Sequence, residues 1–327
     1  MQFRLLFFCT LLSINVTSQN YVQYHQTFNR IDEDVISEDY STAINRLDSI
    51  YVNYDFIYAR HCFKALQISC KADDSARAML WLEKAFKQGV PIWMVRSNTL
   101  TQKVLGYAES ERNISNYDSL HFIYQKEINI HLRKTIDSLY EIDQKYTNKV
   151  NDAFILFRYT YHGLKWIKNN KNQAKILHEI INNYGFPGER LIGLPANIED
   201  STQYMKQFNY YGPLLQETNA YIMLIHYYSN PQPDMNKDLL ENIETGNLPP
   251  YQYGALNDFL ASWGKGKYGN FSFYNVWHED PEGQNNEQIN LRRSAIGLNS
   301  CEQQNRNSLI WRNSRKNSMA NSRVILE

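Results

Sequence analysis

The sequence predicts an all-α protein. Apolar residues recur at helical spacing along most of the chain, whereas the alternation typical of β-strands is scarce. Glycines and prolines fall mainly at the ends of the helical segments. Of the 327 residues, 43% are hydrophobic and 21% are charged, which excludes wholesale disorder. We therefore expect N-terminal helical hairpins over residues 19–115 and a second helical domain over 119–300 that carries a long aromatic loop.

The chain begins with residues typical of an export signal. Arg4 precedes an apolar run over residues 5–12, and Val16-Thr17-Ser18 fits a cleavage site. The run is too short to cross a bilayer, which needs about 20 residues. We expect residues 1–18 to be a signal peptide and the mature chain to reach the periplasm or the extracellular space, with no later transmembrane span. The alternatives are a membrane anchor and lipid attachment at Cys9, although the bulky residues before Cys9 do not suit lipid attachment.

From Ser37 onward the N-terminal region is predicted to form consecutive helices. Their expected ranges are 41–51, 55–70 and 75–88. Asp74 is the expected N-cap of the third helix, and Gly89 followed by Pro91 is expected to end it. The pattern from Ala78 to Gly89 resembles the second helix of a tetratricopeptide or Sel1-type repeat. The resemblance implies a tetratricopeptide-like region over 19–115.

The cysteine pattern gives no reason to expect a metal or another cofactor. Cys62 and Cys70 fall two turns apart on one predicted helix, a separation of about 12 Å. That distance is too long for a disulfide, so both are expected to be buried small hydrophobes. With Cys301 the mature chain has three thiols, and they form neither a zinc pattern nor a redox pair.

The second domain is predicted as a further series of helices joined by longer loops, after a connecting segment at 92–118. The expected helices cover 119–148, 152–169, 173–184, 214–228, 234–244, 251–263 and 287–296. The helix over 214–228 is the most apolar and is expected to be central and buried. Gly185 and Gly297 are expected to end the helices that precede them. Residues 188–212 are loop-rich, and the aromatic segment 264–283 is expected to be a long ordered loop or a small hairpin. The basic segment 301–327 is expected to be disordered.

Several spaced motifs in the second half resemble a bacterial family of unknown function. They are Asp143-Gln144, Gly185-Phe186-Pro187 with Ile192-Gly193, His226, Asp258, Tyr268-Gly269, Glu279-Asp280-Pro281-Glu282, and Arg292-Arg293 through Leu298. The resemblance covers roughly Leu132 to Gln304, and it implies a helical domain from a bacterial source with no settled activity. The chain departs from the pattern at Thr147, Asn170, Gln173 and Asn270-Phe271, so a site that needs the usual groups there would be altered.

The candidate catalytic residues are His226, Asp258, Tyr268 and Arg292. His226 lies among apolar residues of its helix and could act as a general base held by Asp258. A buried histidine satisfied by one structural partner is the commoner arrangement. Arg292 and Arg293 point about 100° apart on a helix, so one can bind a carboxylate inside while the other meets solvent.

Two further motifs are weaker candidates. The carboxylates of Glu279, Asp280 and Glu282 could ligate a hard cation or transfer protons, although an ordinary turn that salt-bridges to Arg292 or Arg293 fits the spacing better. Glycines 264, 266 and 269 follow a predicted helix rather than a strand, so they do not form a dinucleotide-binding loop.

The charge balance limits the possible partners. Lys+Arg and Asp+Glu both count 34, so nothing in the overall charge favours nucleic acid or an anionic membrane. The leading prediction is an interaction or scaffold module of the cell envelope, with an unknown protein or small molecule as its partner. The alternative is a small hydrolase or ligand-binding domain centred on His226. Whether the chain is an enzyme depends on whether the four candidate residues meet around a pocket.

Overall fold

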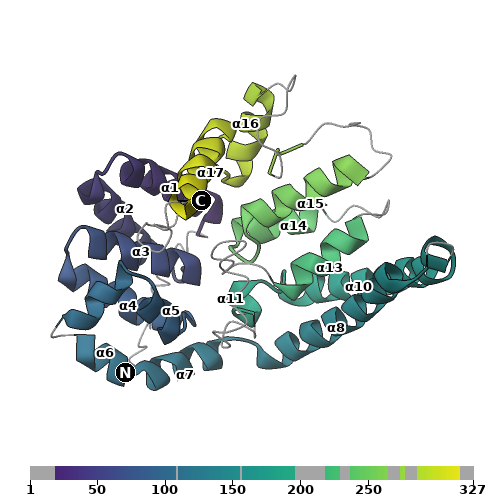
Figure 1. Ribbon diagram of the computed structural model, residues 1–327, viewed down its shortest axis with the longest axis horizontal. Helices are drawn as coiled ribbons and strands as arrows, with labels where there is room; N and C mark the ends of the chain where they lie inside the picture. The colour runs from purple at the N-terminus through teal and green to yellow at the C-terminus, as the bar shows by residue number, and fades with distance from the viewer. Residues whose placement is uncertain are drawn as a thin grey trace, which may run out of the picture.

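The computed structural model describes residues 19–107, 110–154, 157–195, 218–228, 236–263, 273–276 and 286–316, and every regular element in them is helical. The all-α prediction is therefore confirmed (Figure 1). The expected signal peptide, Tyr268 and the acidic motif at 279–282 lie outside the described residues. The elements are α1 Tyr21–Ile36, α2 Tyr40–Asn53, α3 Ala59–Lys71, α4 Ser75–Lys87, α5 Ile92–Ser97, η1 Thr101–Gly106, α6 Ser110–Ser115, α7 Tyr117–Glu127, α8 Ile130–Asp152, η2 Arg158–His162, α10 Gly163–Tyr184, α11 Glu189–Ile192, α13 Asn219–Tyr228, α14 Asn236–Glu244, α15 Pro250–Trp263, α16 Asn286–Ile296 and α17 Cys301–Lys316.

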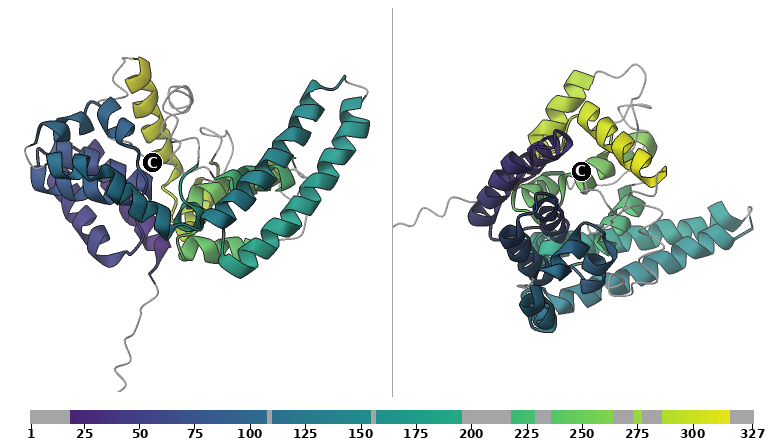
Figure 2. Two further views of the ribbon diagram at one scale, coloured as in Figure 1. Left: turned by 90° about the horizontal axis from the view of Figure 1, so that it is seen from below. Right: turned by 60° about the vertical axis from the view of Figure 1, so that its left-hand side comes forward.

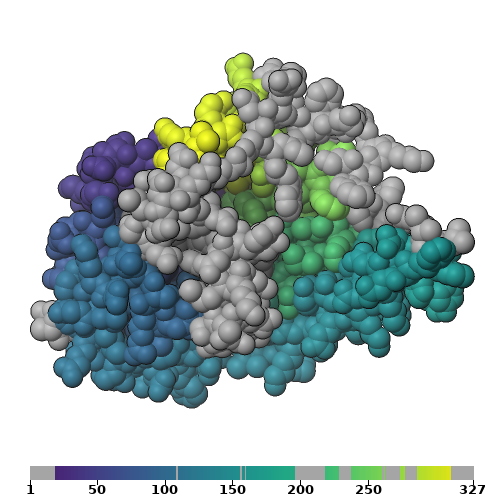
Figure 3. Space-filling model, in the orientation of Figure 1, coloured from purple at the N-terminus to yellow at the C-terminus, as the bar shows by residue number. Residues whose placement is uncertain are grey.

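Two clusters of buried apolar residues form the body of the molecule. The first extends from Tyr21 to Val104 and includes Leu194, and the second extends from Leu132 to Ile296. Figure 1 shows α1 to α6 around the first cluster and α8 to α15 around the second, with α7 leading from one to the other. Figure 3 shows the same two groups of helices at opposite sides of one face.

The N-terminal helices follow the predicted pattern closely. Asp74 accepts a hydrogen bond from the Arg77 amide at 3.0 Å, which confirms it as the N-cap of α4. Gly89 has a φ of +84°, a conformation that suits glycine at a helix end. Cys62 and Cys70 are buried, unbridged thiols on α3, as expected. That these helix pairs are tetratricopeptide-like stays a prediction.

Helix α1 is absent from the sequence-based prediction. Asn20 caps it by accepting the Val22 and Gln23 amides. Its inner face carries Tyr24 and Phe28 together with buried polar side chains such as Asp32, so the apolar periodicity is interrupted. Asp32 forms a 2.8 Å ion pair with Lys64 of α3, and neither side chain is exposed.

Helices α8 and α10 form a long pair that projects from the body, which we call the arm (Figure 2). The single helix predicted over 119–148 is broken into α7 and α8 because Asn129 turns the chain and caps α8 through the Leu132 amide. The break predicted between 169 and 173 is wrong, since α10 is continuous there. Asn170 and Gln173 are buried inside the arm base, where each donates a side-chain hydrogen bond to a backbone carbonyl.

The first part of the expected disordered tail is helical. Helix α17 covers Cys301–Lys316, and Cys301 and Asn307 are buried. Gln303 donates to the Asn29 carbonyl at 2.7 Å, so α17 is tied to α1. The prediction of disorder rests on polar composition and is wrong for residues 301–316. A helix with few apolar residues can be held by specific hydrogen bonds to its neighbours. Residues 317–327 lie outside the described part.

Candidate functional site

His226 is paired with Asp143. Their Nδ1 and Oδ2 atoms are 2.7 Å apart, which joins the end of α13 to the middle of α8. The Asp143 side chain is 1% exposed and that of His226 is 21% exposed, so the histidine faces outward from a buried carboxylate. Gln144 donates to the same Asp143 oxygen at 3.0 Å. The carboxylate that orients His226 is thus Asp143 rather than the predicted Asp258.

Side chains from α8 and α10 enclose this pair. The Trp166 ring lies edge-on to the His226 ring with centroids 5.7 Å apart, and its Nε1 donates to the Thr147 hydroxyl at 3.1 Å. Thr147 donates in turn to the Asp143 carbonyl at 3.1 Å, and Asn170 donates to the His226 carbonyl at 3.4 Å. Asp143, Thr147, Asn170 and His226, named from the family resemblance, therefore meet where α8, α10 and α13 converge.

The pair has the chemistry of a base and its orienting group. If Asp143 accepts the Nδ1 proton, the unprotonated Nε2 is the acceptor atom of the His226 ring. The other Asp143 oxygen, Oδ1, is buried without a hydrogen-bond partner among the described residues. The hydroxyl in this network belongs to Thr147 and is hydrogen-bonded to Trp166 and to the Asp143 carbonyl. These contacts therefore provide a candidate base but no nucleophile.

Asp258 has a different task. Its two oxygens accept the backbone amides of Tyr274 and Val276, each at 2.6 Å. Asp258 is buried on α15, so it fixes the short segment 273–276 against that helix. Each carboxylate oxygen thus accepts one backbone N–H group, which gives Asp258 a structural role.

The paired arginines hold the same segment. Arg293 is buried and donates to the backbone carbonyls of Tyr274 and Asn275, at 2.7 and 3.3 Å. It also reaches the Asn299 and Gln304 side-chain oxygens at 2.8 and 2.6 Å. Burial lowers the pKa of the Arg293 guanidinium from its usual value. The inner arginine therefore binds carbonyl and amide oxygens, whereas a carboxylate was expected.

Arg292 lies beside it and is only half-buried. It donates to the Phe273 carbonyl at 3.0 Å, and its guanidinium lies 4.4 Å from the centre of the Phe273 ring. Asp258, Arg292 and Arg293 thus meet around residues 273–276, whereas His226 meets Asp143. Tyr268 lies outside the described residues, so its place relative to either group stays a prediction.

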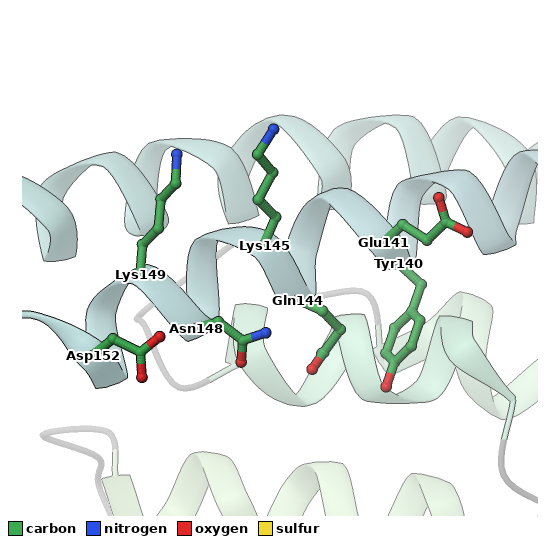
Figure 4. A pocket seen from close by; sticks show the side chains of 7 residues that line it. All are labelled: Tyr140, Glu141, Gln144, Lys145, Asn148, Lys149 and Asp152. Carbon is green, nitrogen blue, oxygen red and sulfur yellow. The ribbon is translucent and has the colours of Figure 1, made fainter.

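The surface beside the His226 pair holds a shallow groove along α8 (Figure 4). Tyr140 and Gln144 point to one side of the helix, and Lys145 and Lys149 extend to the other. All of the lining residues belong to α8, so the groove does not enclose a small molecule in the manner of a ligand pocket.

Asp143 could have been found from the sequence. It follows Leu132, Ile136 and Leu139 at spacings of three and four, on the apolar stripe of its predicted helix. A carboxylate on such a stripe must be paired when the helix is buried, and His226 was the histidine on the most apolar helix. The two residues are 83 positions apart in the chain, so the periodicity of either helix alone does not show that they meet.

The described residues contain no group of three or more His, Cys, Asp or Glu side chains arranged to hold a metal ion. None of the helices described here combines the length and the apolar composition that crossing a bilayer requires. No family model, curated protein or solved structure matches this chain.

Proposed function

We propose that this chain is a helical interaction or scaffold module of the cell envelope. The observation that carries the proposal is the use of Asp258 and Arg292, two of the four candidate catalytic groups, to hold the backbone of residues 273–276. Hydrogen bonds of this kind stabilise a fold, so both side chains have a structural use that needs no substrate. Export rests on the leader-like residues 1–18 and belongs to the same proposal.

The arrangement of helices supports an interaction role. The arm extends the molecule beyond its two buried cores and presents helix surface on several sides (Figure 2). The groove on α8 is shallow, which suits contact with a large partner better than enclosure of a small metabolite. Repeat proteins built from stacked helix pairs bind through extended faces, which the predicted tetratricopeptide-like region would offer.

A ligand-binding survey tests the proposal. Thermal unfolding of wild type and His226→Ala would be compared across a broad panel of metabolites. The matched control is His178→Ala, because His178 forms a 3.1 Å pair with Asp238 that is exposed on the surface. We expect no compound to stabilise wild type and His178→Ala while leaving His226→Ala unchanged. A compound with that signature would overturn the scaffold proposal.

The second candidate is a hydrolase or ligand-binding site centred on His226. The 2.7 Å contact with the buried Asp143, whose other oxygen lacks a partner among the described residues, favours it. In this case Asp143→Asn would remove the orienting charge and shift the pH profile of any hydrolysis. A panel of activated esters and phosphoesters, followed across pH for wild type and Asp143→Asn, would detect the activity. A rate equal to that of buffer for both proteins would remove this candidate.

A further inference from the structure

The end of the arm exposes a cluster of large apolar side chains. We call Phe154, Phe157, Tyr161 and Leu164 the arm tip. Their exposed fractions are 69%, 58%, 54% and 65%, so each leaves most of its surface in water. A single exposed apolar residue is ordinary, but four of them within eleven positions at the end of one projection form a patch.

The same part of the chain is strongly basic although the whole chain is neutral. Between residues 145 and 175 there are seven Lys or Arg residues and one acidic residue, Asp152. Six of the basic residues are exposed lysines, and no ion pair joins them to a carboxylate in the described structure. They are Lys145, Lys149, Lys165, Lys168, Lys171 and Lys175. The balanced total charge therefore conceals a local concentration of positive charge on the arm.

Apolar and basic groups share one side of α10. At 100° per residue, Lys165, Lys168, Lys171 and Lys175 fall within about 120° of the helix circumference. Leu164 lies within the same sector, and the Lys165 ammonium lies 4.0 Å from the centre of the Tyr161 ring. We call these four lysines the basic face. The arm tip and the basic face are continuous with each other.

The position of the arm leaves this surface accessible. Figure 2 shows the joined ends of α8 and α10 far from the first core. The patch lies at the end of a narrow projection, and a typical protein interface buries about 800 Å² per partner over a complementary shape. A lipid surface needs no complementary shape, because aromatic rings enter the headgroup boundary while lysines stay at the phosphates.

We propose that the arm tip docks on an anionic phospholipid surface. The rings of Phe154 and Phe157 enter the headgroup boundary, and the basic face binds the phosphate and other anionic headgroups. This inference deepens the proposed interaction role by naming its partner. It requires no transmembrane span, since the contact is peripheral and reversible.

Vesicle flotation tests this inference with the full mature chain. Vesicles of phosphatidylcholine would be compared with vesicles that also contain phosphatidylglycerol. We expect wild type to float with the anionic vesicles at low salt and to be released at high salt, because exposed charges are screened. Lys165→Gln with Lys168→Gln is expected to weaken binding about fivefold for each lysine removed, or roughly 30-fold together. Phe154→Ser with Phe157→Ser is expected to weaken binding by about tenfold or more.

A matched control separates the arm tip from exposed aromatic surface in general. Phe122 on α7 is 53% exposed, and the Lys126 ammonium lies 4.4 Å from the centre of its ring. Phe122→Ser is therefore expected to bind vesicles as wild type does. All of the substituted side chains are exposed, so the circular dichroism spectrum of each variant should match that of wild type.

Four results would overturn the inference. Three of them are equal flotation with neutral and anionic vesicles, flotation of the tip variants at the wild-type level, and binding of the basic face to a duplex oligonucleotide with no affinity for vesicles. A tip-dependent dimer seen by light scattering, without vesicle binding, would likewise assign the surface to a second copy of the chain. Any of these results would overturn the lipid-docking inference and leave the scaffold proposal standing. The scaffold proposal is tested separately, by the metabolite survey with His226→Ala.

Discussion

Replacement of Arg293 by methionine probes the part of the structure where helix α16, the segment 273–276 and the start of α17 meet. Methionine keeps an unbranched apolar stem of similar length and removes the guanidinium. Arg293 is completely buried, so the change removes a donor that several acceptors in the interior share. The adjacent Arg292→Met is the matched control, because Arg292 is half-buried on the same helix.

The expected loss of stability follows from the contacts. Arg293 donates to carbonyls of the segment 273–276 and to the Asn299 and Gln304 side chains. A buried acceptor that loses its donor costs about 1–3 kcal/mol, so removal of a guanidinium that serves several acceptors is expected to cost about 3–5 kcal/mol. Arg292 has one recorded hydrogen bond and one cation–π contact, so its removal is expected to cost about 1 kcal/mol.

Urea unfolding followed by far-ultraviolet circular dichroism measures both variants. We expect the free energy of unfolding of Arg293→Met to fall by about 3–5 kcal/mol and that of Arg292→Met to fall by about 1 kcal/mol. A second probe, tyrosine and tryptophan fluorescence, shows whether the second core unfolds separately. If both variants lose stability within about 0.5 kcal/mol of each other, the structural role assigned to Arg293 is refuted.

Three other perturbations follow from the buried groups. Burial raises the pKa of Glu189 from its usual 4.5 to about 8, so folding favours its protonated form. The stability that protonated Glu189 contributes is therefore complete below pH 4.5 and is lost as the pH rises through 8. Glu189→Gln should abolish this pH dependence. Lys64→Met leaves Asp32 charged and buried, at an expected cost of about 3–5 kcal/mol in urea unfolding. Gly193→Ala places a Cβ 2.2 Å from the Tyr124 hydroxyl at a φ of +76°, so thermal unfolding should show a loss of about 2 kcal/mol or more.

Each of these three predictions has an outcome that would contradict it. Wild type and Glu189→Gln with the same difference in stability at pH 5 and pH 8.5 would exclude a raised pKa for Glu189. The control for Lys64 is Arg46→Met, which breaks a partly exposed pair with Asp34 and should cost about 1 kcal/mol or less. The control for Gly193 is Gly106→Ala, since an added Cβ there meets no atom within 4 Å. Equal losses within either pair would contradict the assigned contacts.

The sequence predicts those helices whose apolar residues recur at helical spacing. Helices α13 and α15 begin and end within a few residues of their predicted limits where the structure describes them. Helix α1 was missed because His25, Asn29 and Asp32 are buried among its aromatic residues. Burial of such polar groups depends on partners elsewhere in the chain, which periodicity does not reveal.

The candidate site shows the same limit. His226 was singled out because it is a polar residue on an apolar helix, and the structure gives it a carboxylate partner. The partner proved to be Asp143 on a helix that is 83 residues away in sequence. The sequence groups Asp258 and Arg292 with His226 only through the family resemblance and their residue types. Their actual partners are backbone groups of residues 273–276. Every residue type carries the same backbone groups, so the sequence does not show which of them a side chain will bind.

Amide hydrogen exchange at Tyr274 and Val276 tests most directly whether Asp258, a candidate catalytic residue, has a structural role instead. In wild type both amides donate to Asp258, so they should exchange slowly. In Asp258→Asn one carboxylate oxygen becomes an NH2 group that cannot accept, and exchange at one or both amides should accelerate while the amides of α3 remain protected. Unchanged protection at both positions would show that Asp258 is available for another role and would contradict the account.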